Sequence, residues 1–559
     1  MDNQRLIPVF LLLVVLFLIW QRWVEFHGQK EPPPPQATAP DAPAAQAGTA
    51  SLERLNLPSV AAPAETSAPA PDLPSARKIR VVTDIFEAEI DTALGDIRHV
   101  GLRTYPQSLD QPKQPFVLFK DTGSEIFIAQ TGLLPAASMP AVPNHYGDSP
   151  QGFVAEQEEY RLKDGQDSLE VPLTWTDSSG LKVTKIYTFH RDSFVIDLDQ
   201  RVENGSGQDW TGRQYRQFLR TPPVTKRSFF TGGVYTYTGG AVSTPTKHYE
   251  KISFKAMDEH DLNEEVTGGW VAMIQHYFLG AWIPDQDQAN GFFSRRSPGT
   301  QRYVLGMVGQ DRTVVPGETR DFHTELYAGP KIQDRLDSLA PHLRLTVDYG
   351  YLTVIAQPLF WLLELIHSVI RNWGWSIIVL TILIKAAFFK LSETSYKSMA
   401  NMRRLAPMMA KLKDRYGDDK QRLNQAMMDF YKKEKINPLG GCLPILVQIP
   451  VFISLYWVLL ESVELRQAPF MLWIQDLSTK DPYYVLPLIM GATMFIQQKL
   501  NPAPPDPIQA KVMMALPFVF TVFFLWFPAG LVLYWVVNNV LSISQQYVIT
   551  RRIEAGAKA

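Results

Sequence analysis

The stretch from Val512 to Thr550 decides the fold class, and it reads VMMALPFVFTVFFLWFPAGLVLYWVVNNVLSISQQYVIT. It holds 39 residues without one Asp, Glu, Lys or Arg. As a helix with a rise of 1.5 Å per residue it would be about 58 Å long, roughly twice the hydrocarbon core of a bilayer. The stretch therefore predicts two membrane spans, with Phe527-Pro-Ala-Gly530 as the hairpin between them.

Other apolar runs precede this stretch. Ile436 to Leu460 and Pro482 to Gln498 carry no charged residue, and Trp373 to Phe389 carries only Lys385. Leu6 to Trp20 is also apolar, and bulky residues follow it where a signal peptide would have a small-residue cleavage site. Buried core helices of a soluble protein are the alternative, but several such runs with aromatic margins disfavour it. We predict an N-terminal transmembrane anchor and five C-terminal spans, at residues 1–24 and about 372–390, 442–461, 482–498, 512–527 and 531–550.

The distribution of charge predicts the orientation. Residues 390–435 hold twelve Lys and Arg against six Asp and Glu, and Arg551, Arg552 and Lys558 lie near the C-terminus. The positive-inside rule places both segments in the cytoplasm. Six spans then leave both termini in the cytoplasm and the long region after the first span outside. The net charge of -2 gives no sign of a DNA partner, and the single cysteine excludes a disulfide framework and a Cys-based metal site.

The region outside the membrane divides into three parts. Residues 25–77 are rich in Pro and Ala and predict a disordered linker. Residues 78–340 show short alternating runs such as Lys182–His190 and Phe194–Val202, which predict an all-β sandwich domain. Residues 341–371 are apolar but interrupted by Gln, Pro, Glu and His, which favours an interfacial helix over a seventh span. Six histidines of the β region lack metal-ligand spacing, so we expect surface or structural roles for them: His99, His145, His190, His248, His260 and His276.

The cytoplasmic segment 391–436 predicts a helical hairpin with its turn at Gly417-Asp-Asp419. Its methionines either pack the two arms together or form an adaptable docking surface: Met399, Met402, Met408, Met409, Met427 and Met428. Basic residues of the hairpin and of the C-terminal tail are candidates for docking cytoplasmic partners: Arg403, Arg404, Lys411, Lys413, Arg415, Arg551 and Arg552.

Lys385 lies within a predicted span, in the run LTILIKAAFF from Leu380 to Phe389. An ionisable residue inside the membrane is a functional candidate, although Lys385 could also extend its ammonium to the cytoplasmic interface. Thr381 shares its helix face, and other spans bring polar groups to a similar depth, including Gln448, Ser454, Thr521 and Asn538. No Asp or Glu lies within the predicted hydrocarbon zone, so neither a coupled transporter nor a proton relay is indicated. An unpaired cation among polar groups would attract an acidic segment of another protein.

Four motifs stand out along the chain: NWGWSII from Asn372, NPLGGCLP from Asn437, VELRQAPF from Val463 and LWFPAGLVLY from Leu525. They resemble the YidC/Oxa/Alb family of membrane protein insertases. The opening MDNQR and GGWVAM from Gly268 share the resemblance, which extends over essentially the whole chain.

The resemblance implies a periplasmic β-supersandwich, a five-helix insertase core, no enzymatic activity and no cofactor. Lys385 would match the cation of a hydrophilic groove that draws in the polar segment of a client protein, with Thr381 beside it. Helices at residues 443–460 and 512–527 would guide the apolar client segment into lipid, and Tyr534 and Trp535 belong to the same client-contacting region. The implied partners are nascent membrane proteins, the Sec translocon, the ribosome, the signal-recognition machinery and membrane lipids. The implied location is the bacterial inner membrane.

The sequence departs from the family pattern at three positions. Lys385 stands where the family usually has Arg, and it keeps the charge without the planar guanidinium. Lys390 and Trp535 stand where Pro and Tyr are expected. A channel or transporter, and an anchored periplasmic enzyme or sugar-binding protein, are the competing hypotheses. A midplane carboxylate, an inverted repeat or a catalytic motif in residues 79–327 would favour them, and the sequence offers none.

Overall fold

The computed structural model describes residue 73 and residues 75–122, 125–137, 139–146, 149–223, 236–417, 419–433, 443–501 and 507–556. The predicted anchor (1–24) lies outside these residues, as does the linker (25–77) apart from residues 73 and 75–77. The described chain forms two units. One is a β domain that extends to Asp348 and includes residues 461–464, and the other is a helical unit made of the remaining residues from Tyr349 onward.

The larger sheet of the β domain has eleven strands in the order β13-β16-β17-β10-β5-β3-β2-β1-β6, with β18 paired to β10 and β4 paired to β3. Neighbours pair antiparallel, apart from β6, which pairs parallel with β1. The strands are β1 (Lys78–Val82), β2 (Phe86–Asp91), β3 (Asp96–Ser108), β4 (Gln111–Phe119), β5 (Phe127–Pro135), β6 (Glu159–Arg161), β10 (Trp210–Arg220), β13 (Asn263–Thr267), β16 (Ala289–Arg296), β17 (Tyr303–Gly309) and β18 (Arg312–Val314).

The smaller sheet has eight strands in the order β12-β11-β14-β15-β19-β9-β8-β7. Its strands are β7 (Ser168–Thr176), β8 (Leu181–His190), β9 (Val195–Asn204), β11 (Gly239–Ser243), β12 (Glu250–Ile252), β14 (Trp270–Gln275), β15 (Phe278–Ile283) and β19 (Thr319–Pro330). Two short helices complete the domain, α3 (Phe254–Glu259) and α4 (Gln333–Leu339).

Strand periodicity explains why the two sheets stack. Along β9, half-buried and buried residues alternate at every position, so one face of the smaller sheet lies in the core. Contacts cross between the sheets: the indole of Trp282 in β15 donates a 3.2 Å hydrogen bond to the Gln217 carbonyl in β10. The side chain of Gln200 in β9 donates to the Thr131 hydroxyl in β5 at 2.9 Å. The structure therefore confirms the predicted all-β sandwich.

The helical unit contains eight α-helices within the described residues. They are α5 (Thr353–Ile370), α6 (Trp373–Ala387), α7 (Phe389–Tyr416), α8 (Lys420–Lys433), α9 (Leu443–Glu461), α10 (Val485–Leu500), α11 (Pro507–Phe524) and α12 (Ala529–Gly556). Short 3₁₀ turns lie at Leu343–Thr346, Gly350–Leu352 and Val463–Leu465. The first two precede α5, which therefore begins later than the predicted interfacial helix at residue 341.

Local signals set the beginning and end of α6. The Asn372 side chain accepts a hydrogen bond from the Trp375 amide at 3.1 Å, which is the N-cap that α6 requires. Arg371 just before it adopts φ 57°, which ends α5 with a left-handed residue. At the other end, the axes of Trp373–Ala387 and Phe389–Ala400 differ by 66°, so α6 and α7 are separate helices. α7 and α8 form the predicted hairpin.

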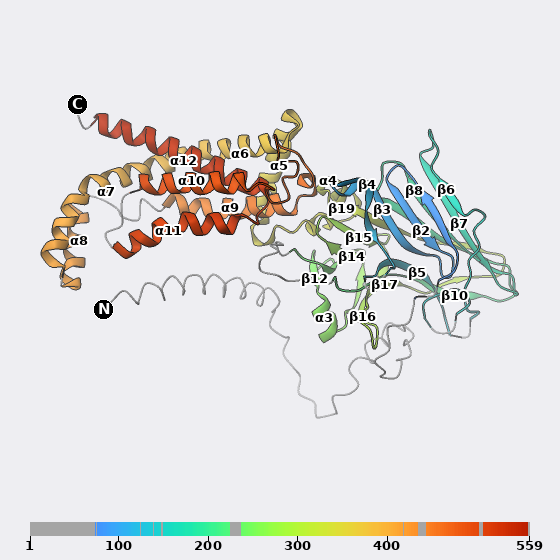
Figure 1. The fold of residues 1–559 in the computed structure, drawn as a ribbon. Coiled ribbons are helices and arrows are strands. Elements are labelled where there is room, and N and C mark those ends of the chain that lie inside the picture. Colours follow the sequence, from blue (N-terminus) through green and yellow to red (C-terminus); the bar gives the residue numbers. More distant parts are fainter. Residues whose placement is uncertain are drawn as a thin grey trace, which may run out of the picture. The chain divides into compact units, whose positions relative to one another are not determined.

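Helix α12 is the centre of the packing in the helical unit. It packs against α6, α7 and α10, and α10 also packs against α11 (Figure 1). Apolar side chains on the outer faces of α10 and α11 stay exposed: Leu488, Ile489, Ile496, Phe518, Val519, Val522 and Phe523. An apolar surface of this extent is typical of contact with lipid or protein rather than water.

Helix length and mean hydropathy together identify few complete spans among the described residues. The helix Gly350–Ile370 is long and apolar enough to be a span by itself. The two helices Trp373–Ala387 and Phe389–Ala400, which meet at a bend, would be a second span if they are counted together. Parts of α9, α10 and α11 are apolar but shorter. The six spans, their boundaries and the interfacial position of residues 341–371 therefore stay predictions.

Candidate functional site

The ammonium of Lys385 is buried within the helical unit, with 6% of the residue exposed. Its Nζ donates a 2.7 Å hydrogen bond to Oγ of Ser542 in α12. Tyr396 in α7 also hydrogen-bonds the Ser542 side chain. Three helices thus contribute polar groups to one buried position, because α12 packs against both α6 and α7.

The polar contacts continue from Ser542 toward α9. The Ser542 hydroxyl donates to the carbonyl of Asn538, one turn earlier in α12, at 2.7 Å. The Asn538 side-chain oxygen accepts a 2.8 Å hydrogen bond from the amide of Gln448 in α9. We call Lys385, Ser542, Asn538 and Gln448 the polar relay, since its hydrogen bonds connect α6, α12 and α9. The structure thus brings together three of the residues that the sequence analysis proposed.

Three other predicted groove residues direct their hydroxyls into their own helices. Thr381 donates to the Ile377 carbonyl at 2.6 Å, Ser454 to the Pro450 carbonyl at 2.8 Å and Thr521 to the Pro517 carbonyl at 2.6 Å. Such bonds to the carbonyl four residues earlier satisfy a hydroxyl in an apolar setting. Thr381 and Ser454 are almost fully buried, so they fill the helix interfaces as small polar side chains outside the polar relay.

Tyr534 and Trp535 lie against the same residue of α9. Tyr534 stacks on Phe452 with ring centroids 5.9 Å apart, and Trp535 meets Phe452 edge to face at 4.5 Å. Trp535 also contacts Phe524 of α11 at 5.2 Å. These aromatic pairs pack α12 against α9 and α11, one turn before the polar relay begins at Asn538.

No ion pair involves Lys385 within the part of the chain that the structure describes. The neighbouring Lys390, in contrast, is an exposed residue that pairs with Glu393 in α7 at 3.6 Å. The ammonium of Lys385 is therefore held by the Ser542 hydroxyl, and its charge is not compensated by a carboxylate among the described residues.

Ser542 and Tyr396 were not among the residues predicted from the sequence. Ser542 lies four residues after Asn538, so helical periodicity alone places it on the same face of α12. Tyr396 falls beyond the bend at Phe388, and the direction of α7 after that bend could not be obtained from the sequence. Asn539, the residue after Asn538, donates through its side-chain amide to the Thr493 hydroxyl of α10 at 3.2 Å.

Four of the basic side chains that the sequence suggests for docking are exposed, two in the α7–α8 hairpin and two near the end of α12. They are Lys411, Arg415, Arg551 and Arg552. The side chains of Arg403, Arg404 and Lys413 lie outside the described residues.

The methionines of the hairpin lie in two different environments. Met409 packs between the arms, where its sulfur lies 3.6 Å from the Tyr431 hydroxyl. Met408 and Met428 are more than half exposed, so they belong to the outer surface.

Comparisons with known proteins agree with this architecture. The family model described as "YidC periplasmic domain" matches residues 78–362, and the one described as "60Kd inner membrane protein" matches residues 365–556. "Membrane protein insertase YidC" of Thioalkalivibrio sulfidiphilus is 52% identical over 581 residues, which cover 100% of both chains. The protein of that name from Methylococcus capsulatus is 52% identical over 560 residues, 99% of each chain.

A solved structure, "Active YidC insertase crystal structure with the first transmembrane domain resolved", is 15% identical with a TM-score of 0.37. The match covers 85% of this chain and 93% of the chain in that crystal structure. The curated relatives are named as insertases and not as enzymes. Because the family models cover both units and the identity to curated members extends over the full length, the chain belongs to the YidC family of membrane protein insertases, inner membrane proteins with a periplasmic domain.

Proposed function

We propose that this protein inserts client membrane proteins into the inner membrane by using Lys385 to receive a polar client segment. The observation that carries the proposal is the buried ammonium of Lys385, which hydrogen-bonds the Ser542 hydroxyl and has no ion pair among the described residues. A client carboxylate that approached Lys385 would supply the missing counter-charge. The polar relay would then offer further hydrogen-bonding groups along α12 and α9.

The energetic barrier to insertion lies in the polar segment of the client. Burial of the client's apolar span in lipid is favourable, at about 25 cal/mol for each Å² of apolar surface removed from water. Transfer of a carboxylate into a low-dielectric region without a partner is strongly unfavourable. At 4 Å and an effective dielectric of 20, a cation attracts that carboxylate by about 4 kcal/mol. One well-placed lysine can therefore lower the barrier without any chemical step.

The apolar client segment would leave along α9 and α11. Ile449 of α9 and Phe518, Val519, Val522 and Phe523 of α11 expose about half of their surface or more. These side chains would exchange contacts with lipid for contacts with an apolar client helix at little net change in free energy. The client can thus move sideways into the bilayer once its polar segment has passed Lys385.

The cytoplasmic hairpin and the basic tail would deliver the client. Exposed Lys411, Arg415, Arg551 and Arg552 offer positive charges suited to ribosomal RNA or to acidic partner surfaces, including the signal-recognition machinery. Exposed Met408 and Met428 add an adaptable apolar contact. For larger clients we propose cooperation with the Sec translocon, and contact with membrane lipids throughout.

Insertion into vesicles tests the role of Lys385. The full-length protein and its Lys385→Arg, Lys385→Ala and Lys385→Glu variants are reconstituted, and a single-span client with an acidic translocated tail is synthesised in their presence. We expect Arg to preserve insertion and Ala and Glu to reduce it, measured as the fraction of client tail protected from protease. Lys390→Ala is the matched control, because that side chain is 92% exposed and lies five residues away.

A second client, with an uncharged tail, separates charge attraction from general damage to the helical unit. Lys385→Ala should affect this client much less than the acidic one. Equal insertion of the acidic client by the Arg, Ala and Glu variants would show that the charge of Lys385 plays no part. A photo-crosslinker at Gln448 should label the client tail in transit, whereas one at the exposed Leu109 of the β domain should not.

A further inference from the structure

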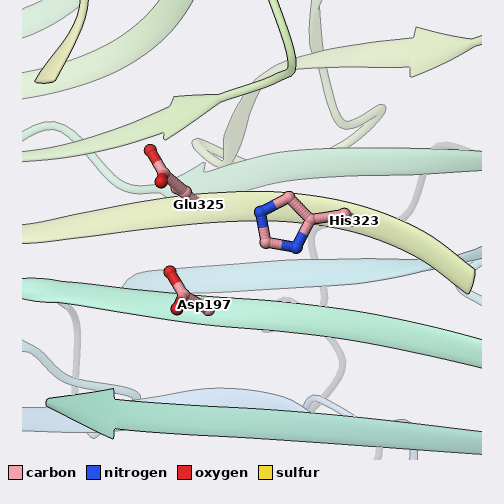
Figure 2. Close-up of side chains that lie close together, drawn as sticks. All are labelled: Asp197, His323 and Glu325. Atoms are coloured by element: carbon pink, nitrogen blue, oxygen red, sulfur yellow. The ribbon is translucent and has the colours of Figure 1, made fainter.

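Asp197, His323 and Glu325 form a mixed cluster on one face of the smaller sheet. Asp197 lies in β9, and His323 and Glu325 lie in the neighbouring β19 (Figure 2). One ligand atom from each residue, an imidazole nitrogen and two carboxylate oxygens, lies within 4.8 Å of the other two. Figure 2 shows one ring nitrogen of His323 facing the carboxylates of Asp197 and Glu325. We call these three residues the β9–β19 cluster.

The register of the two strands fixes this arrangement. β9 and β19 pair antiparallel, with Asp197 directly opposite Glu325 and Asp199 directly opposite His323. Buried core residues alternate with these positions on both strands, so all four side chains project from the face of the sheet that lies away from the core. The side chains of the cluster are half-buried, so each keeps some access to solvent.

Two carboxylates opposite each other are an unfavourable pair for a sheet to maintain. Like charges at directly opposed positions destabilise the pairing of two strands. Asp197 and Glu325 occupy such positions, with an imidazole beside them. A cation bound between the two carboxylates would convert this repulsion into attraction on both strands.

The hydrogen bonds around the cluster orient its ligand atoms. The Nδ1 atom of His323 lies 2.9 Å from Oδ1 of Asp199, so Nε2 remains for the cluster. A carboxylate on the far nitrogen of a histidine is the usual support of a metal-binding imidazole, because it fixes the tautomer and the ring. Nε2 of His190, at the end of β8, lies 2.6 Å from Oδ2 of Asp197 and restrains that carboxylate in a similar way.

The donor set identifies the class of ion. One imidazole nitrogen with two carboxylate oxygens suits Zn²⁺, which binds His and Asp or Glu and accepts water at a free position. Mg²⁺ and Ca²⁺ prefer oxygen ligands throughout, and the nitrogen donor disfavours them. We propose that Asp197, His323 and Glu325 bind one Zn²⁺ ion, which ties β9 to β19 in the periplasmic domain. The inference is independent of the proposed insertion mechanism.

Zinc titration of the full-length protein tests this site. The protein is purified in detergent without a histidine tag, treated with a chelator and titrated with Zn²⁺ in competition with a chromophoric chelator. We expect one saturable site per chain. X-ray absorption of the zinc complex should show one imidazole nitrogen among otherwise oxygen ligands, at the Zn–N distance of about 2.0–2.1 Å that is usual in proteins.

Three substitutions and two matched controls locate the bound ion. His323→Gln, Glu325→Gln and Asp197→Asn should each weaken Zn²⁺ binding at least tenfold. Asp321→Asn removes a carboxylate two residues before His323 that already pairs with Arg201 at 2.9 Å, and it should bind zinc like the wild type. His99→Gln removes a histidine of β3 outside the cluster and should also leave binding unchanged.

Thermal unfolding gives a readout that does not depend on the competitor. Zinc should raise the unfolding temperature of the wild type and of both controls, since an ion that binds only the folded state stabilises it. Glu325→Gln should unfold no earlier than the wild type without zinc, because it removes the opposed charge, and should gain nothing from zinc. No saturable binding, or equal zinc affinity in the wild type and all three cluster variants, would overturn the proposal.

Discussion

The Nζ atom of Lys385 in α6 donates a 2.7 Å hydrogen bond to Oγ of Ser542 in α12, 157 residues later in the chain. The Ser542 hydroxyl donates its own hydrogen to the Asn538 carbonyl, so its oxygen is free to accept from the ammonium. Ser542 therefore fixes the position of the ammonium against α12. A client carboxylate would compete with this hydroxyl for Lys385.

Ser542→Ala should reduce insertion of an acidic-tailed client, although less than Lys385→Ala does. The substitution removes a hydrogen bond to a charged group, which is generally worth about 1.5–3 kcal/mol. Ser542→Thr keeps the hydroxyl and should restore activity in the same vesicle assay. The control is Ser544→Ala, which removes an exposed hydroxyl from the same helix. Equal activity of Ser542→Ala and Ser544→Ala would show that Ser542 does not position the lysine.

Much of the fold could be predicted because its signals are local. The charge-free run from Val512 to Thr550 predicted two helices, and the structure places them at Pro507–Phe524 and Ala529–Gly556. Alternation in Lys182–His190 predicted a strand, and β8 is Leu181–His190. The order of strands in the two sheets could not be predicted, since it depends on pairings such as β9 with β19 between segments far apart in the sequence.

In the candidate sites, too, single residues could be predicted from the sequence, whereas their contacts with distant residues could not. Lys385, Gln448 and Asn538 were found as polar residues within apolar runs, but their partners depend on which helix faces meet. The β9–β19 cluster escaped detection because its histidine and carboxylates have no metal-ligand spacing along the chain. His323 and Asp199 are 124 residues apart in sequence and meet only through strand register. Spacing rules detect ligands on one helix or turn and miss those that two strands bring together.

Lys185→Met should destabilise the periplasmic domain strongly. The Lys185 ammonium is fully buried and donates 2.7 Å hydrogen bonds to the carbonyls of Leu94 and Thr131. Burial lowers the pKa of Lys185 to about 8, although the attraction of the Asp96 carboxylate acts to raise this pKa. The substitution leaves both carbonyls without this donor, and each buried polar group left unsatisfied generally reduces stability by about 1–3 kcal/mol.

Hydrogen exchange of the β8 and β9 amides measures that loss. The control is Lys182→Met in the same strand, whose partly exposed ion pair with Glu203 should be worth about 1 kcal/mol or less. Comparable exchange rates in the Lys182→Met and Lys185→Met variants would contradict the structural role of Lys185.

Asp96→Asn should change how the periplasmic domain responds to acid. Burial raises the pKa of Asp96, but attraction and a hydrogen bond from His145, with the charges of Arg98 and Lys185, leave it below the usual 3.8. Because the folded pKa is the lower one, Asp96 stabilises the domain above pH 3.8, and that stability is lost as pH falls through the folded value.

The measurement is urea unfolding of the full-length protein, followed through the buried tryptophans of the domain at a series of pH values. Asp96→Asn should be less stable than the wild type at neutral pH, and the difference should shrink as the pH falls below 3.8. Asp321→Asn, at an exposed ion pair, should differ little from the wild type throughout. A constant difference between Asp96→Asn and the wild type across this range would refute the assignment.

Gly491→Ala should separate α10 from α11, and a second substitution should restore the contact. A Cβ at Gly491 would lie 2.0 Å from Oγ1 of Thr521, so the two helices approach closely only because this residue has no side chain. Overpacking of this kind generally reduces stability by about 1–3 kcal/mol. Thr521→Ala removes Oγ1 and Cγ2, and the double variant should recover most of the loss, measured as thermal inactivation in detergent. Because neighbouring substitutions couple only through shared contacts, additive effects of the two changes would mean that α10 and α11 do not meet at this point.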